Sequence, residues 1–228
     1  MENKNGTYFK YAIGEIVLVV IGILIALQIN NWNENRKLKQ KEKVVIESLI
    51  EDLQADYDHF EENKIIFEKQ LILVDQLIAG SANSRVDKTT YLHILRWGGE
   101  MIPIAFEDNI PEEIINKDIK EPIKTYYRDQ KSTLNTYKDY SDVVMDIVRP
   151  FLRRHGIHNP KSVAEAAYDT ENIELLIEEK LVAQYGSEEF GQILFELRLK
   201  TGSIIYDLDN LSKANRKLVP ILKTYITD

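Results

Sequence analysis

The feature that most constrains this chain is an unbroken run of apolar residues near its N-terminus, residues 16–27. With residues 8–14 before it and Gln28 and Ile29 after it, the run reaches about twenty residues, enough for a helix to cross a hydrocarbon core of about 30 Å. Aromatic side chains, which favour membrane interfaces, stand at both ends: Tyr8, Phe9, Tyr11 and Trp32. The pattern predicts a single transmembrane anchor within residues 1–33, followed by a helical domain of residues 34–228.

Two other structures use apolar runs of this kind. A cleavable signal peptide has a shorter apolar core followed by a site of small residues, whereas this run is followed by Gln-Ile-Asn-Asn-Trp-Asn-Glu. A buried helix of a soluble domain has a polar side, whereas Ile and Val lie on every face of residues 16–27. The sequence therefore favours an uncleaved anchor over both alternatives.

Charge is distributed unevenly along the chain. Residues 1–43 hold seven basic and four acidic side chains, so the rest of the chain holds 22 basic and 33 acidic ones, a net charge of −11. Such an acidic domain is a poor candidate for binding nucleic acid, because phosphate binding needs a cationic surface. Five basic residues just past the apolar run are the exception, and we expect them to contact anionic lipid headgroups: Arg36, Lys37, Lys39, Lys41 and Lys43.

Beyond the anchor, the spacing of apolar residues predicts helices. Residues 36–79 carry apolar side chains at intervals of mostly three and four without Pro or Gly, which indicates one long helix that could continue the anchor. Shorter helices are predicted at residues 91–97, 109–118, 161–168 and 171–184, and long ones from Glu121 or Pro122 to Val148 and over residues 188–225. Composition predicts a loop over residues 80–88 and a short extended segment over residues 101–108. The predicted fold is all-α: a transmembrane helix that continues into a stalk and an elongated antiparallel helical bundle.

The segment of residues 10–34 reads KYAIGEIVLVVIGILIALQINNWNE. It resembles the N-terminal signature of an uncharacterised family of single-span membrane proteins from Bacteroidota, and covers 25 of the 228 residues. Members of that family often carry a basic segment before the motif, which implies that the domain after the anchor lies outside the cytoplasm. The resemblance implies no particular activity.

Glu15 is the least ordinary residue of the anchor. On a helix it shares a face with Gly22 and Ala26, a small-x-x-x-small pair that allows two helices to approach closely in lipid. A carboxylate is costly inside a membrane unless it is paired, neutral or near the interface. Glu15 could therefore lie at the headgroup layer, contribute to a helix–helix interface with Gly22 and Ala26, or carry protons as in ion-driven complexes.

No pattern in the chain indicates catalysis. The absence of Cys excludes disulfides, thiolate metal sites and a Cys nucleophile, and the phosphate-binding glycine motifs and the Gly-x-Ser-x-Gly motif are missing. Asp56 and His59 have a spacing that metal sites use, but too few further ligands accompany them, so a solvated acidic face is the better interpretation. The tyrosines of residues 126–140 could line a ligand cleft with Arg96 or Arg128, although such a row more often belongs to a core.

We therefore expect a membrane-tethered scaffold or interaction protein of the bacterial inner membrane, without enzymatic activity or cofactor. Its expected partners are the lipid bilayer and a second copy or another membrane protein, and not nucleic acid. Two alternatives stay open: an extracytoplasmic ligand sensor, and a subunit of an ion-driven complex that uses Glu15. Five basic residues after the anchor against Lys4 and Lys10 before it favour a cytoplasmic domain, while the family resemblance favours the periplasm, which we prefer.

Overall fold

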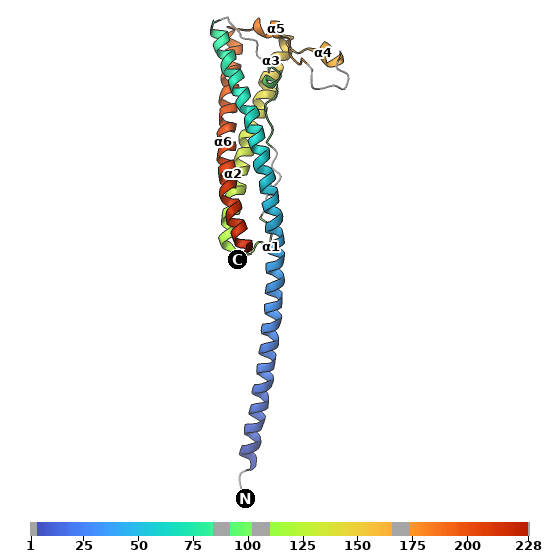
Figure 1. The fold of residues 1–228 in the computed structure, drawn as a ribbon, viewed down its shortest axis with the longest axis vertical. Helices are drawn as coiled ribbons and strands as arrows, with labels where there is room; N and C mark the ends of the chain where they lie inside the picture. Colours follow the sequence, from blue (N-terminus) through green and yellow to red (C-terminus); the bar gives the residue numbers. More distant parts are fainter. Residues whose placement is uncertain (1–3, 84–91, 102–109, 166–173, 228) are drawn as a thin grey trace.

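The protein is described here by a computed structural model, which covers residues 4–83, 92–101, 110–165 and 174–227. Three long helices dominate: α1 (Lys4–Asn83), α2 (Lys117–Asp142) and α6 (Glu188–Thr227). Figure 1 shows an elongated molecule in which the first half of α1 projects alone from a bundle formed by its second half, α2 and α6. The described residues contain no β-strand, and the prediction of an all-α fold is confirmed.

The α1 helix is one continuous element of 80 residues, as the absence of local helix breakers predicted. From residue 14 to Lys41 its side chains are exposed apart from the half-buried Asn33, and burial in the bundle begins at Glu42. We expected a loop from Gly80 onward, but the helix continues to Asn83. Gly80 is buried, and one glycine inside a helix costs only about 1 kcal/mol relative to alanine.

The contacts fix the directions of the three long helices. Glu42 of α1 meets the residues before α2 and the last turns of α6, while Gln70, further along α1, meets Tyr140 near the end of α2 and Thr201 near the start of α6. Thus α6 is antiparallel to α1 and α2, whereas α1 and α2 run parallel. Our expectation of an antiparallel bundle therefore holds for two of the three helix pairs.

The parallel pair requires a return connection. In the described parts of residues 92–116 the chain passes from Gln70, which contacts Ile94, to Asn63, which contacts Glu100, and finally to Glu42 at the base of the bundle. The connection includes the short 3-10 helix η1 (Leu92–Leu95), within the residues where we predicted a short helix. Of the extended segment predicted over residues 101–108, all but Met101 lies outside the described residues.

Buried positions in α1 and α6 recur at alternating intervals of four and three residues, a seven-residue period that keeps one side of each helix on the core. In α1 one set of positions is wholly apolar: Ile46, Leu53, Phe60, Phe67 and Val74. The alternate set contains two apolar residues, Leu49 and Leu77, and four buried polar ones. We call the four polar residues the polar row: Glu42, Asp56, Asn63 and Gln70.

The α2 helix begins earlier than the sequence predicted. The side chain of Asn116 accepts a hydrogen bond from the backbone N–H of Asp118 at 2.8 Å, so Asn116 caps a helix that starts at Lys117 and contains Pro122. Residues 110–116, expected to form part of a separate helix, are not helical. At its far end α2 continues through a π-helical turn, η2 (Val143–Val148), into α3 (Arg149–Arg154).

Proline explains the π-helical turn. Pro150 has no N–H, and in an α-helix its ring would collide with the carbonyl of Asp146. Widening the preceding turn avoids this collision, and the N–H of Arg149 then bonds to the carbonyl of Val144, five residues back. Pro150 therefore changes the helix locally without ending it.

Short elements close the end of the bundle opposite the projecting helix (Figure 1). They are α4 (Pro160–Glu165) and α5 (Glu178–Val182). We predicted a helix over residues 171–184, but residues 174–177 are extended because they pair with residues 157–159: the N–H of Ile177 bonds to the carbonyl of Ile157 at 2.7 Å, and that of Asn159 to the carbonyl of Leu175 at 3.0 Å. Residues 171–173 lie outside the described part of the chain.

Candidate membrane and partner interface

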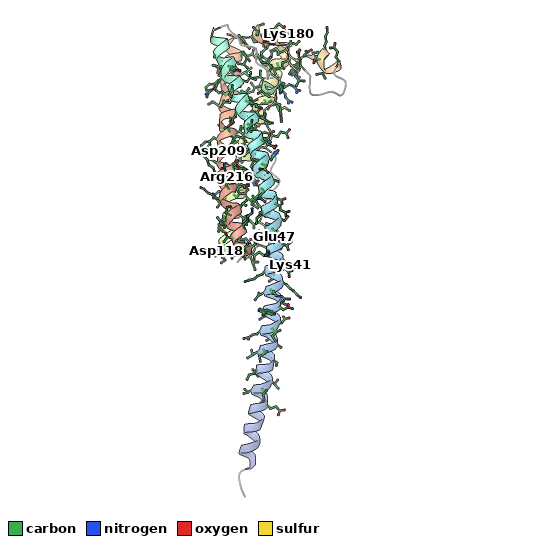
Figure 2. The ribbon with its side chains drawn as sticks, in the orientation of Figure 1. Lys41, Glu47, Asp118, Lys180, Asp209 and Arg216 are labelled. Carbon is green, nitrogen blue, oxygen red and sulfur yellow. The ribbon has the colours of Figure 1, made fainter. Side chains whose placement is uncertain are left out.

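The projecting part of α1 is the most exposed apolar surface in the described chain. The helix of Gly14–Gly80 contains a window long and apolar enough to cross a membrane, none of which is buried. Side chains such as Leu18, 73 % exposed, have no protein contact to cover them. Figure 2 shows side chains radiating from this helix with no other element beside it. The described residues therefore contain one candidate membrane-spanning helix, near the N-terminus.

The residues predicted to form a helix–helix interface lie within this projecting part. Glu15, Gly22 and Ala26 are all exposed, and a Cβ atom added to Gly22 would meet nothing within 4 Å. The small pair at Gly22 and Ala26 is thus open to a second helix. No described residue of the same chain supplies that helix, so the interface role of the three residues stays a prediction.

The basic cluster lies between the apolar segment and the bundle. Arg36, Lys37, Lys39, Lys41 and Lys43 are all exposed. The Arg36 guanidinium lies 5.5 Å from the ring centre of Trp32, and Lys43 Nζ donates to the backbone carbonyl of Ile226 at 3.0 Å. From Trp32 to Glu42 the helix rises about 15 Å. The predicted contact between the basic cluster and lipid headgroups is not tested by the structure. Lys43 also helps to hold the end of α6 against α1.

Within the basic cluster, between Lys41 and Lys43, Glu42 joins α1 to the other two helices. Its Oε1 accepts hydrogen bonds from the backbone N–H groups of Ile115 and Asn116 at 2.7 and 2.8 Å, and its Oε2 accepts from the hydroxyl of Tyr225 at 2.9 Å. The carboxylate is 1 % exposed. The projecting helix and the base of the bundle are therefore joined by charge-assisted hydrogen bonds.

The rest of the polar row ties α1 to its neighbours. Gln130 Nε2 donates to Asp56 Oδ2 at 3.2 Å, and the Glu100 N–H donates to Asn63 Oδ1 at 2.7 Å. The interpretation of Asp56 as part of a solvated acidic face is wrong, because Asp56 is 0 % exposed. The signal in the sequence was the seven-residue spacing of Asp56, Asn63 and Gln70, in phase with the buried apolar positions.

The tyrosines of α2 pack into or against the core: Tyr126, Tyr127 and Tyr140 are buried, and Tyr137 is half-buried. Tyr126 and Tyr140 are 2 % and 0 % exposed, and burial raises the pKa of both hydroxyls well above the ordinary value of 10. Arg128 is exposed and lies beside Asp129. In the described part of the chain no group of three or more His, Asp or Glu side chains is arranged to hold a metal ion.

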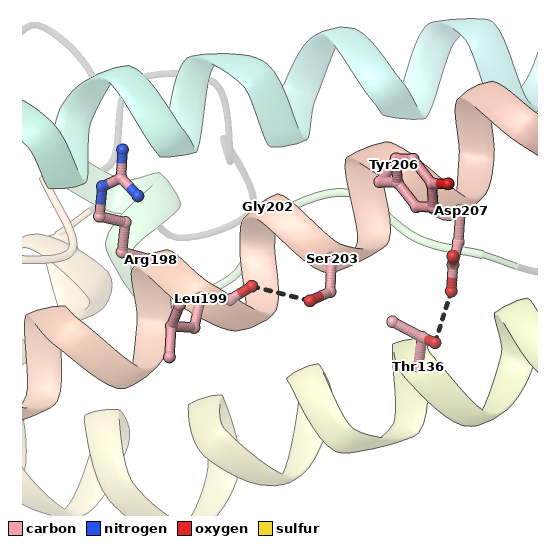
Figure 3. A pocket seen from close by; sticks show the side chains of 7 residues that line it. All are labelled: Thr136, Arg198, Leu199, Gly202, Ser203, Tyr206 and Asp207. Atoms are coloured by element: carbon pink, nitrogen blue, oxygen red, sulfur yellow. Dashed lines mark hydrogen bonds between the residues drawn. The ribbon is translucent and has the colours of Figure 1, made fainter.

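A second exposed apolar surface runs along α6 on the side away from the core. We call it the outer stripe: Phe195, Leu199, Gly202 and Tyr206, at intervals of four, three and four. Leu199, Gly202 and Tyr206 border a groove of about 500 Å³, shown in Figure 3. At the edge of this groove the hydroxyl of Thr136, in α2, donates to Asp207 Oδ2 at 2.6 Å. The stripe was not predicted from the sequence, although its spacing is that of a helix face.

Charges beside the outer stripe are paired within the chain. Arg198 Nε donates to Asp75 Oδ1 of α1 at 2.6 Å, and Lys213 Nζ pairs with Asp209 one turn away. A Cβ atom added to Gly202 would meet nothing within 4 Å, so the middle of the stripe is open to close approach. The stripe is thus an apolar strip with two ion pairs beside it, while Asp207, at the edge of the groove, accepts a hydrogen bond from the neutral Thr136.

Residues 15–87 match a family of unknown function (DUF6090). The match spans the apolar segment and most of the rest of α1, and it agrees with the expectation of an uncharacterised family while assigning neither a group of organisms nor an activity. Comparison with curated proteins and with solved structures finds no match for the chain.

Proposed function

We propose that this protein is a membrane-tethered scaffold that acts by binding other proteins rather than by catalysis. The observation that carries the proposal is the continuity of α1, which runs as one helix from an exposed apolar segment into the core of the bundle. A chain built in this way holds a rigid bundle at a fixed distance from a bilayer. We place the bundle on the periplasmic side of a bacterial inner membrane, on the basis of the family resemblance.

The tether is tested by placing charge in the apolar segment of the full chain. A variant with Ile21→Arg and Leu24→Arg puts two arginines near its centre, each costing about 3 kcal/mol in membrane insertion. Its control places the same two changes at exposed positions of the bundle, Ile65→Arg and Ile72→Arg, whose exposed fractions of 50 % and 59 % resemble the 48 % and 54 % of Ile21 and Leu24.

After an alkaline wash of cell membranes, we expect the control to stay in the membrane fraction and the Ile21/Leu24 variant to be released. Equal retention of the two variants would contradict the tether. The side of the membrane is read from protease protection of a C-terminal tag in spheroplasts. Cleavage of the tag while a cytosolic marker survives is the result expected for a periplasmic bundle.

The partner we propose for the outer stripe is a second copy of the chain. Copies anchored in one membrane point the same way, so the stripe of one α6 can meet the same residues of another around a two-fold axis. Identical surfaces repel one another if their rims carry unpaired charge, and the pairs Arg198–Asp75 and Lys213–Asp209 reduce that repulsion. Gly202 allows the two backbones to approach.

The absence of native Cys makes this pairing testable by disulfide cross-linking in membranes. Gly202→Cys should give a covalent dimer on oxidation, whereas Glu62→Cys, at an exposed position of α1, should not. Adding Leu199→Glu to the Gly202→Cys chain should abolish the dimer, since a charge would face its own copy. A monomeric Gly202→Cys chain, or equal cross-linking at both positions, would refute the pairing while leaving the tether experiment unaffected.

A further inference from the structure

Arginine side chains gather at the end of the bundle opposite the projecting helix. Arg96 follows η1, Arg149 and Arg153 belong to α3, and His158 lies just after α3. Arg149 is held by its neighbours: its Nε donates to the backbone carbonyl of Arg96 at 3.3 Å, and its guanidinium lies 5.0 Å from the ring centre of Trp97. These contacts hold the Arg149 side chain in place and do not involve hydrogen bonds from its two terminal nitrogens.

The charge of this cluster is not balanced within the described residues. Two neighbours on the same segment, Arg154 and His155, both contact Glu189, but no described carboxylate forms an ion pair with Arg96, Arg149 or Arg153. Burial and the charge of Arg96 lower the pKa of Arg149. Repulsion between like charges is therefore present here, in a domain that is otherwise strongly acidic.

His158 adds a polar atom that lacks a partner. Its Nε2 is buried and accepts or donates no hydrogen bond within the described residues. Burial, followed by the charges of the three arginines, lowers the pKa of His158, so the imidazole is neutral at physiological pH. A neutral imidazole can present an N–H at this nitrogen, which is a donor suited to an anion held by the neighbouring guanidinium groups.

We propose that Arg96, Arg149, Arg153 and His158 form a binding site for the phosphate group of a small molecule. Guanidinium groups match phosphate oxygens in pairs and bind them more strongly than neutral donors do. A dianion would offset the repulsion among the three arginines and give His158 a partner. The site lies roughly 60 Å from Trp32 along α1, too far to reach headgroups of the membrane that holds the anchor. The proposal is independent of the scaffold function.

The test is calorimetric titration of the full chain, held in nanodiscs of zwitterionic lipid, with inorganic phosphate. Sodium chloride at matched ionic strength serves as the blank. We expect a dissociation constant of about 0.1–1 mM. Arg153→Gln, a change at an exposed position, should weaken binding roughly tenfold. The matched control Arg154→Gln, whose native side chain pairs with Glu189, should change the affinity less than about twofold.

Two results would overturn the proposal. One is the absence of phosphate binding up to about 10 mM, and the other is an equal loss in Arg153→Gln and Arg154→Gln, which would indicate a general charge effect. Docking of the nanodisc-held chain onto vesicles of anionic lipid separates the possible sources of phosphate. Docking that depends on Arg153, without binding of free phosphate, would assign the cluster to a lipid headgroup and refute the small-molecule site.

Discussion

Gln70 makes the sharpest test of the idea that the polar row fixes the positions of the helices. Its Nε2 donates to the Ile94 carbonyl at 2.6 Å, and its Oε1 accepts from the hydroxyls of Tyr140 at 2.9 Å and Thr201 at 3.3 Å. The side chain is 0 % exposed. One residue of α1 therefore bonds to the return connection, to α2 and to α6.

Replacing Gln70 by Leu keeps nearly the same volume and removes three hydrogen bonds. Each buried polar group left without a partner destabilises the fold by about 1–3 kcal/mol, and burial of the apolar Leu side chain offsets part of this loss. The hydroxyls of Tyr140 and Thr201 can rotate toward other acceptors, so we take the lower end for each group and expect a loss of about 3 kcal/mol in the free energy of unfolding. Gln76→Leu, the same change at an exposed position of α1, should cost less than about 0.5 kcal/mol.

The measurement is urea unfolding of the full chain in nonionic micelles, followed by the near-ultraviolet circular dichroism of the tyrosines. A double-mutant cycle with Tyr140→Phe should give a coupling energy of about 1 kcal/mol with Gln70→Leu, because the two residues share one bond. Unfolding of Gln70→Leu and Gln76→Leu at the same urea concentration would contradict a stabilising role of the Gln70 hydrogen bonds. Strict additivity with Tyr140→Phe would show that the bond between Gln70 and Tyr140 contributes nothing.

Two further predictions concern glycines and pH. Gly99→Ala would place a Cβ 2.8 Å from the Asn63 carbonyl oxygen and should destabilise by about 1–3 kcal/mol, whereas Gly202→Ala, with nothing within 4 Å, should stabilise by up to about 1 kcal/mol; melting temperatures decide the signs. Burial raises the pKa of Tyr185 to about 12 and also raises that of Tyr140. The stability that their neutral forms contribute is complete below the unfolded-state pKa of about 10 and is lost as the pH rises through the folded-state pKa values. Tyrosinate absorbance should therefore show a cooperative step on alkaline unfolding. A smooth titration of all tyrosines would contradict this expectation.

Periodicity predicted the long helices well, because a helix that packs on a core must repeat its apolar residues. The boundaries depended on weaker local signals. Pro122 is acceptable as the first residue of a helix, which suggested a start there. The Asn116 cap, however, gains a hydrogen bond six positions earlier, and the tertiary contacts of α2 outweigh the cost of an internal proline. The extended residues 174–177 were unpredictable locally, because their backbone partners lie at residues 157–159.

The candidate site was predictable in part, for a physical reason. The apolar segment and the basic residues after it are defined by composition alone, so the sequence located both. Contacts between helices are not defined by composition. Asp56 was assigned to solvent because the sequence alone does not reveal that Gln130 lies opposite it. The outer stripe escaped because Phe195 and Leu199 interleave with the core positions of α6 and look like part of them.

The unbroken course of α1 has a mechanical consequence. Because α1 has no break, the bundle would follow any change in the tilt of the apolar segment in a membrane. From Trp32 to Gly80 the axis extends roughly 70 Å, and a change in tilt of about 10°, within the range that bilayer thickness imposes on single helices, would displace the far end by about 12 Å. The thickness of the bilayer around the anchor would thus set how far the distal end leans, and whether two neighbouring copies stand close enough for their α6 helices to touch.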